Sequence, residues 1–234
     1  MEEFTPHTTN FQDGILIPVN KPLDWTSFDV VNKIKYLLKY QREIPKIKIG
    51  HAGTLDPKAT GLLLICTGKG TKQIESLQDM VKTYIATGKL GETTPSFDTE
   101  TEVNETFPTD HITREKLEQV LHDFTGYISQ TPPDFSALRV KGQRAYKMAR
   151  QGKKTNLQPR TVHIKKIEVL EFSKPYFTIS VTCHKGTYIR SLADDIGKAL
   201  QSGAYLTELT RTKIGNYKLD DAYNLPSIEN ILKK

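Results

Sequence analysis

Apolar and polar positions along this chain follow two periods, which predict helices in some stretches and strands in others. A helix from Thr26 or Ser27 to about Lys39 is expected, because either residue can cap it and apolar residues recur at helical spacing at Val30, Val31, Ile34, Leu37 and Leu38. Further helices are expected at residues 113–124, 143–151 and 188–200. Strands are expected at residues 14–19, 62–66, 83–89, 162–172, 177–183 and 206–212. This irregular alternation favours an α/β protein of the α+β type, with a mixed sheet.

The polar stretches do not mark a clear boundary between domains. Residues 1–12 are expected to form a flexible N-terminal tail, and residues 13–234 a single folded domain without a linker or repeat. The stretch from Thr93 to Thr109 is polar and acidic and contains two prolines, Pro95 and Pro108. We expect it to be a mobile loop.

Composition narrows the class of protein. Hydrophobic residues make up 37% of the 234 residues, which is enough for a core, and no apolar run approaches the ~18 residues of a membrane span. The N-terminus lacks the basic start and apolar stretch of a secretory signal. The two cysteines, Cys66 and Cys183, form no Cys-x-x-Cys pair. These features predict a reduced, cytoplasmic protein.

The net charge of +6 is modest, but the charges are segregated. Between Phe135 and Ile167 there is no acidic residue, while the same stretch holds Arg139, Lys141, Arg144, Lys147, Arg150, Lys153, Lys154, Arg160, Lys165 and Lys166. Between Leu90 and Thr113 there is no lysine or arginine. A long block of one sign is typical of phosphate binding, although it can also be plain solvated surface.

The run from Gly50 to Gly61 carries the clearest candidate chemistry. It places one carboxylate, Asp56, on a glycine-rich loop, with His51 five residues before it and Pro57 directly after. Glycines allow close approach of a substrate, and Pro57 biases Asp56 away from helical backbone. The alternative is an ordinary helix start, with Asp56 as the N-cap and Pro57 in the first turn.

The run Gly-His-Ala-Gly-Thr-Leu-Asp-Pro-Lys-Ala-Thr-Gly resembles the signature of the TruB family of tRNA pseudouridine-55 synthases. Stretches at residues 20–22, 25–27, 82–84, 132–137, 185–192 and 211–215 also match that family, in its order. The resemblance implies the pseudouridine synthase fold, a mixed and mainly antiparallel sheet flanked by helices with a central catalytic cleft. It implies base flipping, cleavage of the C1′–N1 bond of uridine 55 in the T-loop of tRNA, and reattachment through C5, without cofactor or metal.

The resemblance also implies roles for single residues. Asp56 would be the catalytic carboxylate and Arg190 its ion-pair partner, while Tyr84 would stack on the flipped uracil and assist proton removal. Tyr188 and Leu209 would line the pocket, His51 would occupy the space that the base leaves, and Lys21 would support the site or contact RNA. The alternatives are a phosphate contact or surface ion pair for Arg190, core packing for the pocket residues, and a structural role for His51.

The basic block is the expected contact with the RNA backbone, chiefly through Lys141, Arg144, Lys147 and Arg150. On a helix over residues 143–151 the last three would lie near one face. Few residues follow Gly215, so no C-terminal PUA domain is expected, and affinity would come from this block. Residues 94–98 depart from the family pattern, because Pro95 stands where an acidic residue is usual.

The expected partner is therefore the T-stem-loop of tRNA, bound by a monomer without a membrane or a small-molecule cofactor. A different class of function is a tRNA-binding folding chaperone with secondary or no catalysis. A weaker alternative is an RNA N-glycosidase that would release free uracil. The presence of Asp56, Tyr84 and Arg190 together favours the isomerase.

Overall fold

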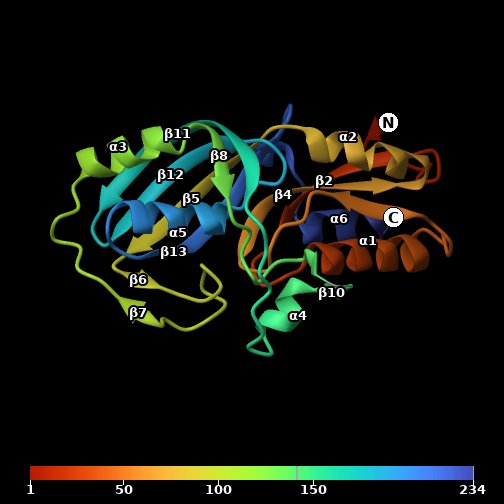
Figure 1. Cartoon of the computed structure of the whole chain (residues 1–234). Coiled ribbons are helices and arrows are strands. Elements are labelled where there is room, and N and C mark those ends of the chain that lie inside the picture. Colours follow the sequence, from red (N-terminus) through yellow and green to blue (C-terminus); the bar gives the residue numbers. More distant parts are fainter. Residues whose placement is uncertain (141, 234) are drawn as a thin grey trace. The chain divides into compact units, whose positions relative to one another are not determined.

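The computed structural model describes residues 1–140 and 142–233, and these divide into two units. The first unit comprises Met1–Tyr84 and Thr210–Lys234, and the second Ile85–Leu209. Among the described residues a ten-stranded sheet contains β5 (Lys82–Leu90) and β13 (Ala204–Ile214), and each of these two strands contributes residues to both units. Figure 1 shows the elements along the chain.

The first unit carries the strand order β1-β2-β4-β13-β5, with β3 also paired to β4 and β14 to β13. Its further strands are β1 (Glu2–Glu3), β2 (Ile15–Lys21), β3 (Ile49–Ala52), β4 (Ala59–Thr67) and β14 (Tyr217–Lys218). Its helices are α1 (Ser27–Gln41), α2 (Ile74–Asp79) and α6 (Leu225–Leu232), with short 3-10 helices at Gly68–Gln73 and Leu219–Asp221. The β2–β4 and β3–β4 pairs are antiparallel, and β1–β2 is parallel.

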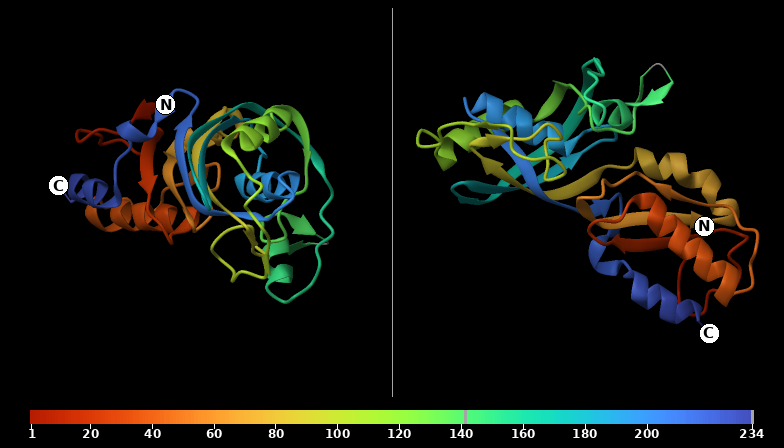
Figure 2. Two further views of the ribbon diagram at one scale, coloured as in Figure 1. Left: turned by 90° about the vertical axis from the view of Figure 1, so that its left-hand side faces the viewer. Right: turned by 90° about the horizontal axis from the view of Figure 1, so that it is seen from below.

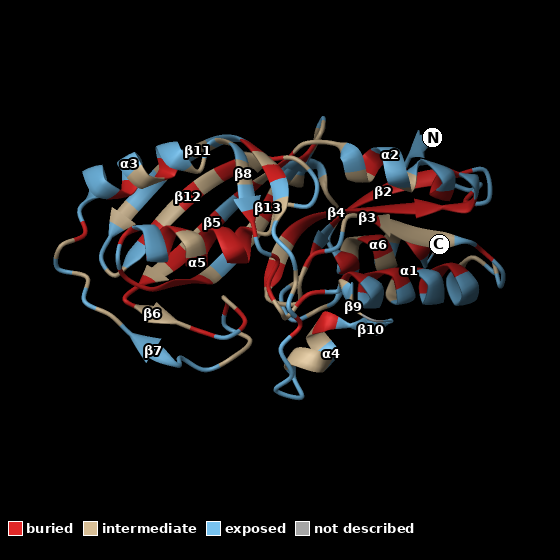
Figure 3. Cartoon of the chain, viewed as in Figure 1, coloured by how far each residue is buried: buried red, intermediate tan, exposed pale blue. Residues whose placement is uncertain are grey.

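Alternating side chains of β2 and β4 fill two cores, one on each face of this part of the sheet. Ile17 and Leu63 belong to the core that also contains residues of α1 and α6, whereas Leu16 and Leu64 belong to the core that contains Leu77 of α2. Because both faces are covered, β4 consists almost entirely of buried residues. Figure 3 shows this burial on the ribbon.

Helix α1 begins where the sequence predicts, for a local reason. The Thr26 hydroxyl accepts a hydrogen bond from the Asp29 amide, and the Asp29 carboxylate accepts one from the Thr26 amide. This reciprocal pair satisfies amide groups that a helix start leaves without partners.

The second unit carries the order β13-β5-β12-β11-β8. Its elements are β6 (Glu92–Thr93), β7 (Glu105–Thr106), α3 (Arg114–Asp123), β8 (Gly126–Gln130), β9 (Arg139–Val140), β10 (Gln143–Arg144), α4 (Ala145–Ala149), β11 (Arg160–Ser173), β12 (Tyr176–Cys183) and α5 (Ile189–Ala199). Strand β11 is antiparallel to both β12 and β8. Figure 2 shows this part of the sheet curving around α5.

The predicted fold class is confirmed, since the sheet is mixed and mainly antiparallel and helices flank it. Two local predictions were wrong. Residues 1–12 are not a loose tail, because β1 pairs with β2 and the apolar rings of Phe4 and Phe11 are buried in the core. The helix expected at residues 143–151 is shorter, since α4 begins only at Ala145. No helix within the described residues is long and apolar enough to cross a membrane.

Candidate active site

Asp56 lies on the loop that joins β3 to β4, residues 53–58, which is called the Asp56 loop below. The two strands are antiparallel neighbours, with His51 opposite Ile65 and Ala52 opposite Leu64. The chain enters β4 at Ala59, and the Ala59 amide donates to the Asp56 carbonyl at 3.1 Å. The alternative of a helix starting at Asp56 and Pro57 was therefore wrong.

Buried side chains from distant segments hold the backbone of the Asp56 loop. The Ser27 hydroxyl, at the start of α1, accepts from the Leu55 amide at 2.9 Å and donates to the Leu55 carbonyl at 3.1 Å. From β13, the guanidinium of Arg211 donates to the carbonyls of Gly53 at 2.9 Å and Leu62 at 2.8 Å. Arg211 is only 1% exposed, so one buried charged group holds both the start of the loop and β4, the strand that follows it.

Lys21, at the end of β2, is the third residue that supports the loop. Its side chain is fully buried, and its Nζ donates to the carbonyls of Pro22 at 2.8 Å and Trp25 at 2.6 Å, with a longer contact of 3.5 Å to Pro57. Burial lowers the pKa of Lys21 to about 8, although the negative charge of Asp56 acts to raise it. These contacts favour support of the loop over direct contact with RNA.

Glycine is needed at Gly61 because β13 approaches β4 there very closely. A Cβ on Gly61 would lie 2.4 Å from the carbonyl oxygen of Arg211, and the residue has φ +101°. Any other residue would push β13 away and carry the Arg211 side chain with it. The glycine-rich motif therefore permits the Arg211 contacts, which the sequence alone did not reveal.

His51 and Tyr84 belong to the same unit as Asp56. His51 is half-buried on β3, and burial together with the positive charge of Arg211 lowers its pKa, which favours a neutral imidazole. Its Nδ1 is buried and makes no hydrogen bond within the described residues. Tyr84 is buried on β5, with its ring centroid 6.0 Å from the Arg211 guanidinium carbon.

Arg190 lies in the first turn of α5, in the second unit, and is buried. It donates to the carbonyls of Ser96 at 3.1 Å and Phe135 at 2.9 Å, and its Nε lies 3.5 Å from a carboxylate oxygen of Asp98. The alternative of an exposed ion pair was therefore wrong. Arg190 also anchors the segment at 94–98, where Thr94, Ser96 and Asp98 are buried, so the loop that we expected to be mobile is attached to α5.

The side chain of Gln130 positions the backbone at Tyr188. Its amide oxygen accepts from the Tyr188 amide at 2.8 Å, and its amide nitrogen donates to the Tyr188 carbonyl at 3.1 Å. The Tyr188 ring lies 5.0 Å from the Arg160 guanidinium carbon. Tyr188 directly precedes α5, so this pair of hydrogen bonds fixes the start of the helix that carries Arg190.

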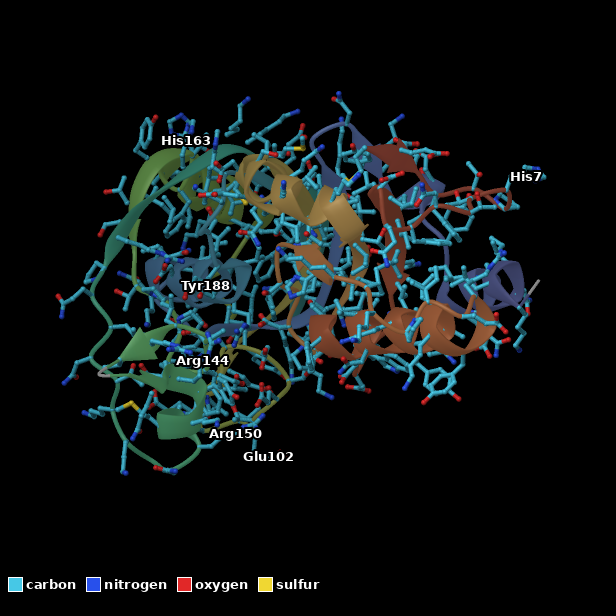
Figure 4. All side chains as sticks on the ribbon, turned by 90° about the vertical axis from the view of Figure 1, so that its right-hand side faces the viewer. His7, Glu102, Arg144, Arg150, His163 and Tyr188 are labelled. Atoms are coloured by element: carbon cyan, nitrogen blue, oxygen red, sulfur yellow. The ribbon has the colours of Figure 1, made fainter. Side chains whose placement is uncertain are left out.

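The cations of the basic segment, which is defined here as residues 142–154, are all exposed. Arg144 lies on β10 before α4, so the predicted face of three cations on one helix was wrong. Arg150 forms an ion pair with Glu100 at 2.6 Å, and Lys147 has no acidic partner among the described residues. Figure 4 labels Arg144 and Arg150 in this region. The expected contact at Lys141 lies outside the described residues.

Comparison with known proteins now adds to this geometry. The model of the TruB family pseudouridylate synthase N-terminal domain matches residues 38–189, and that of the tRNA pseudouridylate synthase B C-terminal domain matches residues 190–234. The chain belongs to the TruB family.

Similar proteins and solved structures support membership of this family. The tRNA pseudouridine synthase B of Parabacteroides distasonis is 52% identical over 225 residues, or 96% of each chain, and that of Phocaeicola vulgatus is 54% identical over 218 residues, or 93% of each. A crystal structure of a Cbf5-Nop10-Gar1 complex matches with a TM-score of 0.71 and 32% identity, over 94% of this chain and 54% of that chain. This chain thus spans about half the length of that structural relative.

The residues that the TruB resemblance singles out divide between the units. Asp56, His51, Tyr84 and Lys21 belong to the first unit, and Arg190, Tyr188 and Leu209, which is half-buried on β13, to the second. The ion pair between Asp56 and Arg190 and the central cleft stay predictions.

Sequence reasoning missed three side chains that position site residues, namely Ser27, Arg211 and Gln130. Two of them gave a usable signal, because Ser27 and Arg211 lie in stretches that match the family. Across the described residues, no three His, Cys, Asp or Glu side chains gather as metal ligands would.

Proposed function

We propose that this protein converts uridine to pseudouridine at position 55 in the T-loop of tRNA. Its membership of the TruB family carries the proposal, together with relatives named tRNA pseudouridine synthase B that match over nearly their whole length. The structure adds a reason why Asp56 can act as the reactive group, since Ser27, Arg211 and Lys21 fix the loop that presents it. A reactive carboxylate benefits from such a rigid support.

The proposed reaction is an isomerisation. The bond from ribose C1′ to uracil N1 breaks, the base rotates, and a bond from C1′ to C5 forms. N1 gains a proton and C5 loses one, so the atoms balance without an oxidant or water. Asp56 acts at the ribose by one of two routes, attack on C1′ or removal of a ribose proton. In either route the carboxylate must be ionised when the base departs.

The other site residues have proposed roles that the resemblance to the TruB family implies. Tyr84 stacks on the extracted uracil and assists proton removal at C5, and Tyr188 and Leu209 line the pocket. His51, half-buried and favoured as neutral, occupies the space that the base vacates. Arg190 favours the ionised form of Asp56. Extraction of a base costs about a few kcal/mol, which is least for a loop nucleotide and is offset by contacts in the pocket.

Recognition of the T-stem-loop is proposed to depend on the basic segment. Its five cations, Arg144, Lys147, Arg150, Lys153 and Lys154, are all exposed. Cations of this kind bind phosphates regardless of sequence, and they release counterions when they do so. The segment therefore supplies affinity, while the Asp56 loop supplies the chemistry.

The test compares three proteins on a tRNA transcript tritiated at uridine C5. The wild type should release about one tritium per tRNA, because one C5–H bond breaks in each turnover, and mapping should place the product at position 55. Asp56→Asn should release none while it still binds the RNA. Asp220→Asn, which changes an exposed carboxylate of the same unit, should behave as the wild type.

The outcomes separate the candidate functions. Tritium release by Asp56→Asn at the wild-type rate would refute the role of Asp56. Tight binding without tritium release by the wild type would favour the folding chaperone. Free uracil in the supernatant would indicate an RNA N-glycosidase.

A further inference from the structure

Helix α1 presents a row of uncovered aromatic rings on the side that faces away from the core. Phe28 is 65% exposed, and Tyr36 and Tyr40 are 56% exposed each. The rings of the two tyrosines lie 4.6 Å apart. The α1 outer face is defined here as Phe28, Asn32, Lys35, Tyr36, Lys39 and Tyr40. At helical spacing these side chains fall within about 140° of one another around the axis, an arc that also contains the exposed carboxylate of Asp29 beside Phe28.

The packing of α1 does not require these rings. The opposite side of the helix supplies the core residues, among them Val30, Ile34 and Leu38, which are all fully buried. An amphipathic helix normally fills its exposed side with polar residues. Large aromatic side chains gathered on an exposed face are typical of interaction sites. We therefore expect the α1 outer face to bind a partner.

The charge of this helix indicates the chemistry of that partner. From Val30 to Arg42 the sequence contains no acidic residue. Lys33 pairs with Glu229, but Lys35 and Lys39 have no acidic partner among the described residues. The Lys39 ammonium lies 4.6 Å from the centroid of the Tyr40 ring. Lysines interleaved with aromatic rings suit a ligand that has both phosphates and flat bases.

The α1 outer face begins beside the Asp56 loop. Ser27, the residue before Phe28, makes both hydrogen bonds to Leu55 of that loop. From Phe28 to Tyr40 the helix rises about 18 Å, which matches roughly five stacked nucleotides of one strand. An RNA that places a nucleotide at the Asp56 loop can therefore continue along α1.

We propose that the α1 outer face binds the RNA substrate beyond the reacting nucleotide. The rings of Phe28, Tyr36 and Tyr40 stack on unpaired bases, and Lys35 and Lys39 contact the phosphates. The inference rests on the proposed function, because it extends the path of the same RNA. It adds a second binding surface, in the unit that carries Asp56, to the basic segment of the other unit.

The experiment measures binding of a tRNA transcript to variants built on Asp56→Asn, so that no turnover occurs. Replacing Tyr36 and Tyr40 together by alanine should weaken affinity by about tenfold or more, the effect typical of losing base stacking. Replacing both by phenylalanine keeps the rings and should keep affinity within about twofold. Tyr176→Ala removes an exposed ring from β12 and serves as the remote control, with unchanged affinity expected.

Alanine favours helices, so α1 should remain folded in the double variant, and circular dichroism checks this. Unchanged affinity of the alanine variant would overturn the proposal. So would a dimer of the parent protein in sedimentation that the alanine variant breaks without loss of affinity, because the partner would then be a second copy. Absence of pseudouridine formation by the wild type would refute the proposed function and would leave this binding measurement intact.

Discussion

The Asp56 loop and the basic segment are held in opposite ways. The loop is short, and side chains from three other segments, Ser27, Arg211 and Lys21, hold its backbone. The basic segment consists of one two-residue strand and a five-residue helix, and its cations are exposed. A reacting carboxylate must be fixed within a fraction of an ångström, whereas charges that bind a polyanion can adapt to it. Rigidity is concentrated where bonds are expected to break.

The largest expected effect comes from releasing the Asp56 loop. Arg211→Ala leaves the carbonyls of Gly53 and Leu62 without their buried donor, and each such loss costs about 1–3 kcal/mol. The free energy of unfolding should fall by about 3 kcal/mol or more, and turnover should fall about 100-fold or more, because a small displacement of a reacting group is costly. Urea denaturation and tritium release measure the two effects.

Two further variants keep this prediction decisive. Arg211→Lys retains the charge without the planar fork of donors, so it should fold and show an intermediate loss of turnover. Lys213→Ala changes an exposed side chain of the same strand and should have little effect. Wild-type turnover in Arg211→Ala would show that the loop does not depend on this guanidinium.

The basic segment should show the opposite result, a loss of binding without loss of stability. Reversing Lys147 and Arg150 to glutamate should weaken tRNA affinity by about tenfold or more, and should lower the slope of affinity against salt by about one to two, since fewer counterions are released. The melting temperature should barely change, because both side chains are exposed. Titration at several salt concentrations tests this.

Lys72→Glu reverses an exposed charge of the first unit and serves as the control for that titration. If its effect on the salt slope equals that of the double reversal, general net charge and not the basic segment sets the affinity. Arg150 should contribute less than Lys147 when each is reversed alone, because Arg150 must first give up its ion pair with Glu100.

The smallest effect is a dependence of stability on pH. Burial, together with the neighbouring Asp194, raises the pKa of Asp195 to about 6. The folded protein then binds more protons than the unfolded chain between about pH 4 and 6, so stability falls as pH rises through this range. Asp195→Asn removes that loss. At pH 7.5 it should be more stable than the wild type by about 1–2 kcal/mol.

The same variant should gain almost nothing at pH 3, where Asp195 is mostly protonated in both states. Thermal melts of the two proteins at pH 3 and pH 7.5 make the comparison. An equal gain at both pH values would assign the effect to packing rather than to ionisation.

The sequence predicted elements whose signals are local. Helix α1 has its cap and its apolar spacing within one stretch, and β4 is one continuous apolar run. Helix α6 was missed although its signal was present, with Asn224 as the cap and Pro226 in the first turn. Strand β8 was missed because its five residues, Gly126–Gln130, show no alternation of apolar and polar positions.

Contacts between residues far apart in the chain could not be predicted from the sequence. The stretch from Thr93 to Thr109 was expected to be mobile because its composition is polar. No local pattern shows that Arg190, about ninety residues later, donates a hydrogen bond to the Ser96 carbonyl. Arg211 lies in a stretch that matches the family, but no local pattern shows its contacts, because they depend on the close approach of β4 and β13 at Gly61. The sequence suggested candidate reactive groups, which stay predictions, and it did not reveal most of the side chains that support them.

Gln130 has a consequence for which amino acids its position can accept. Its side chain gives Tyr188 one donor and one acceptor, as the backbone of a neighbouring strand would. Glutamate, when ionised, would only accept, lysine would only donate, and asparagine would be too short to do both. The last residue of β8 thus acts as a template for the start of α5, and of these four residues glutamine alone can fill that role.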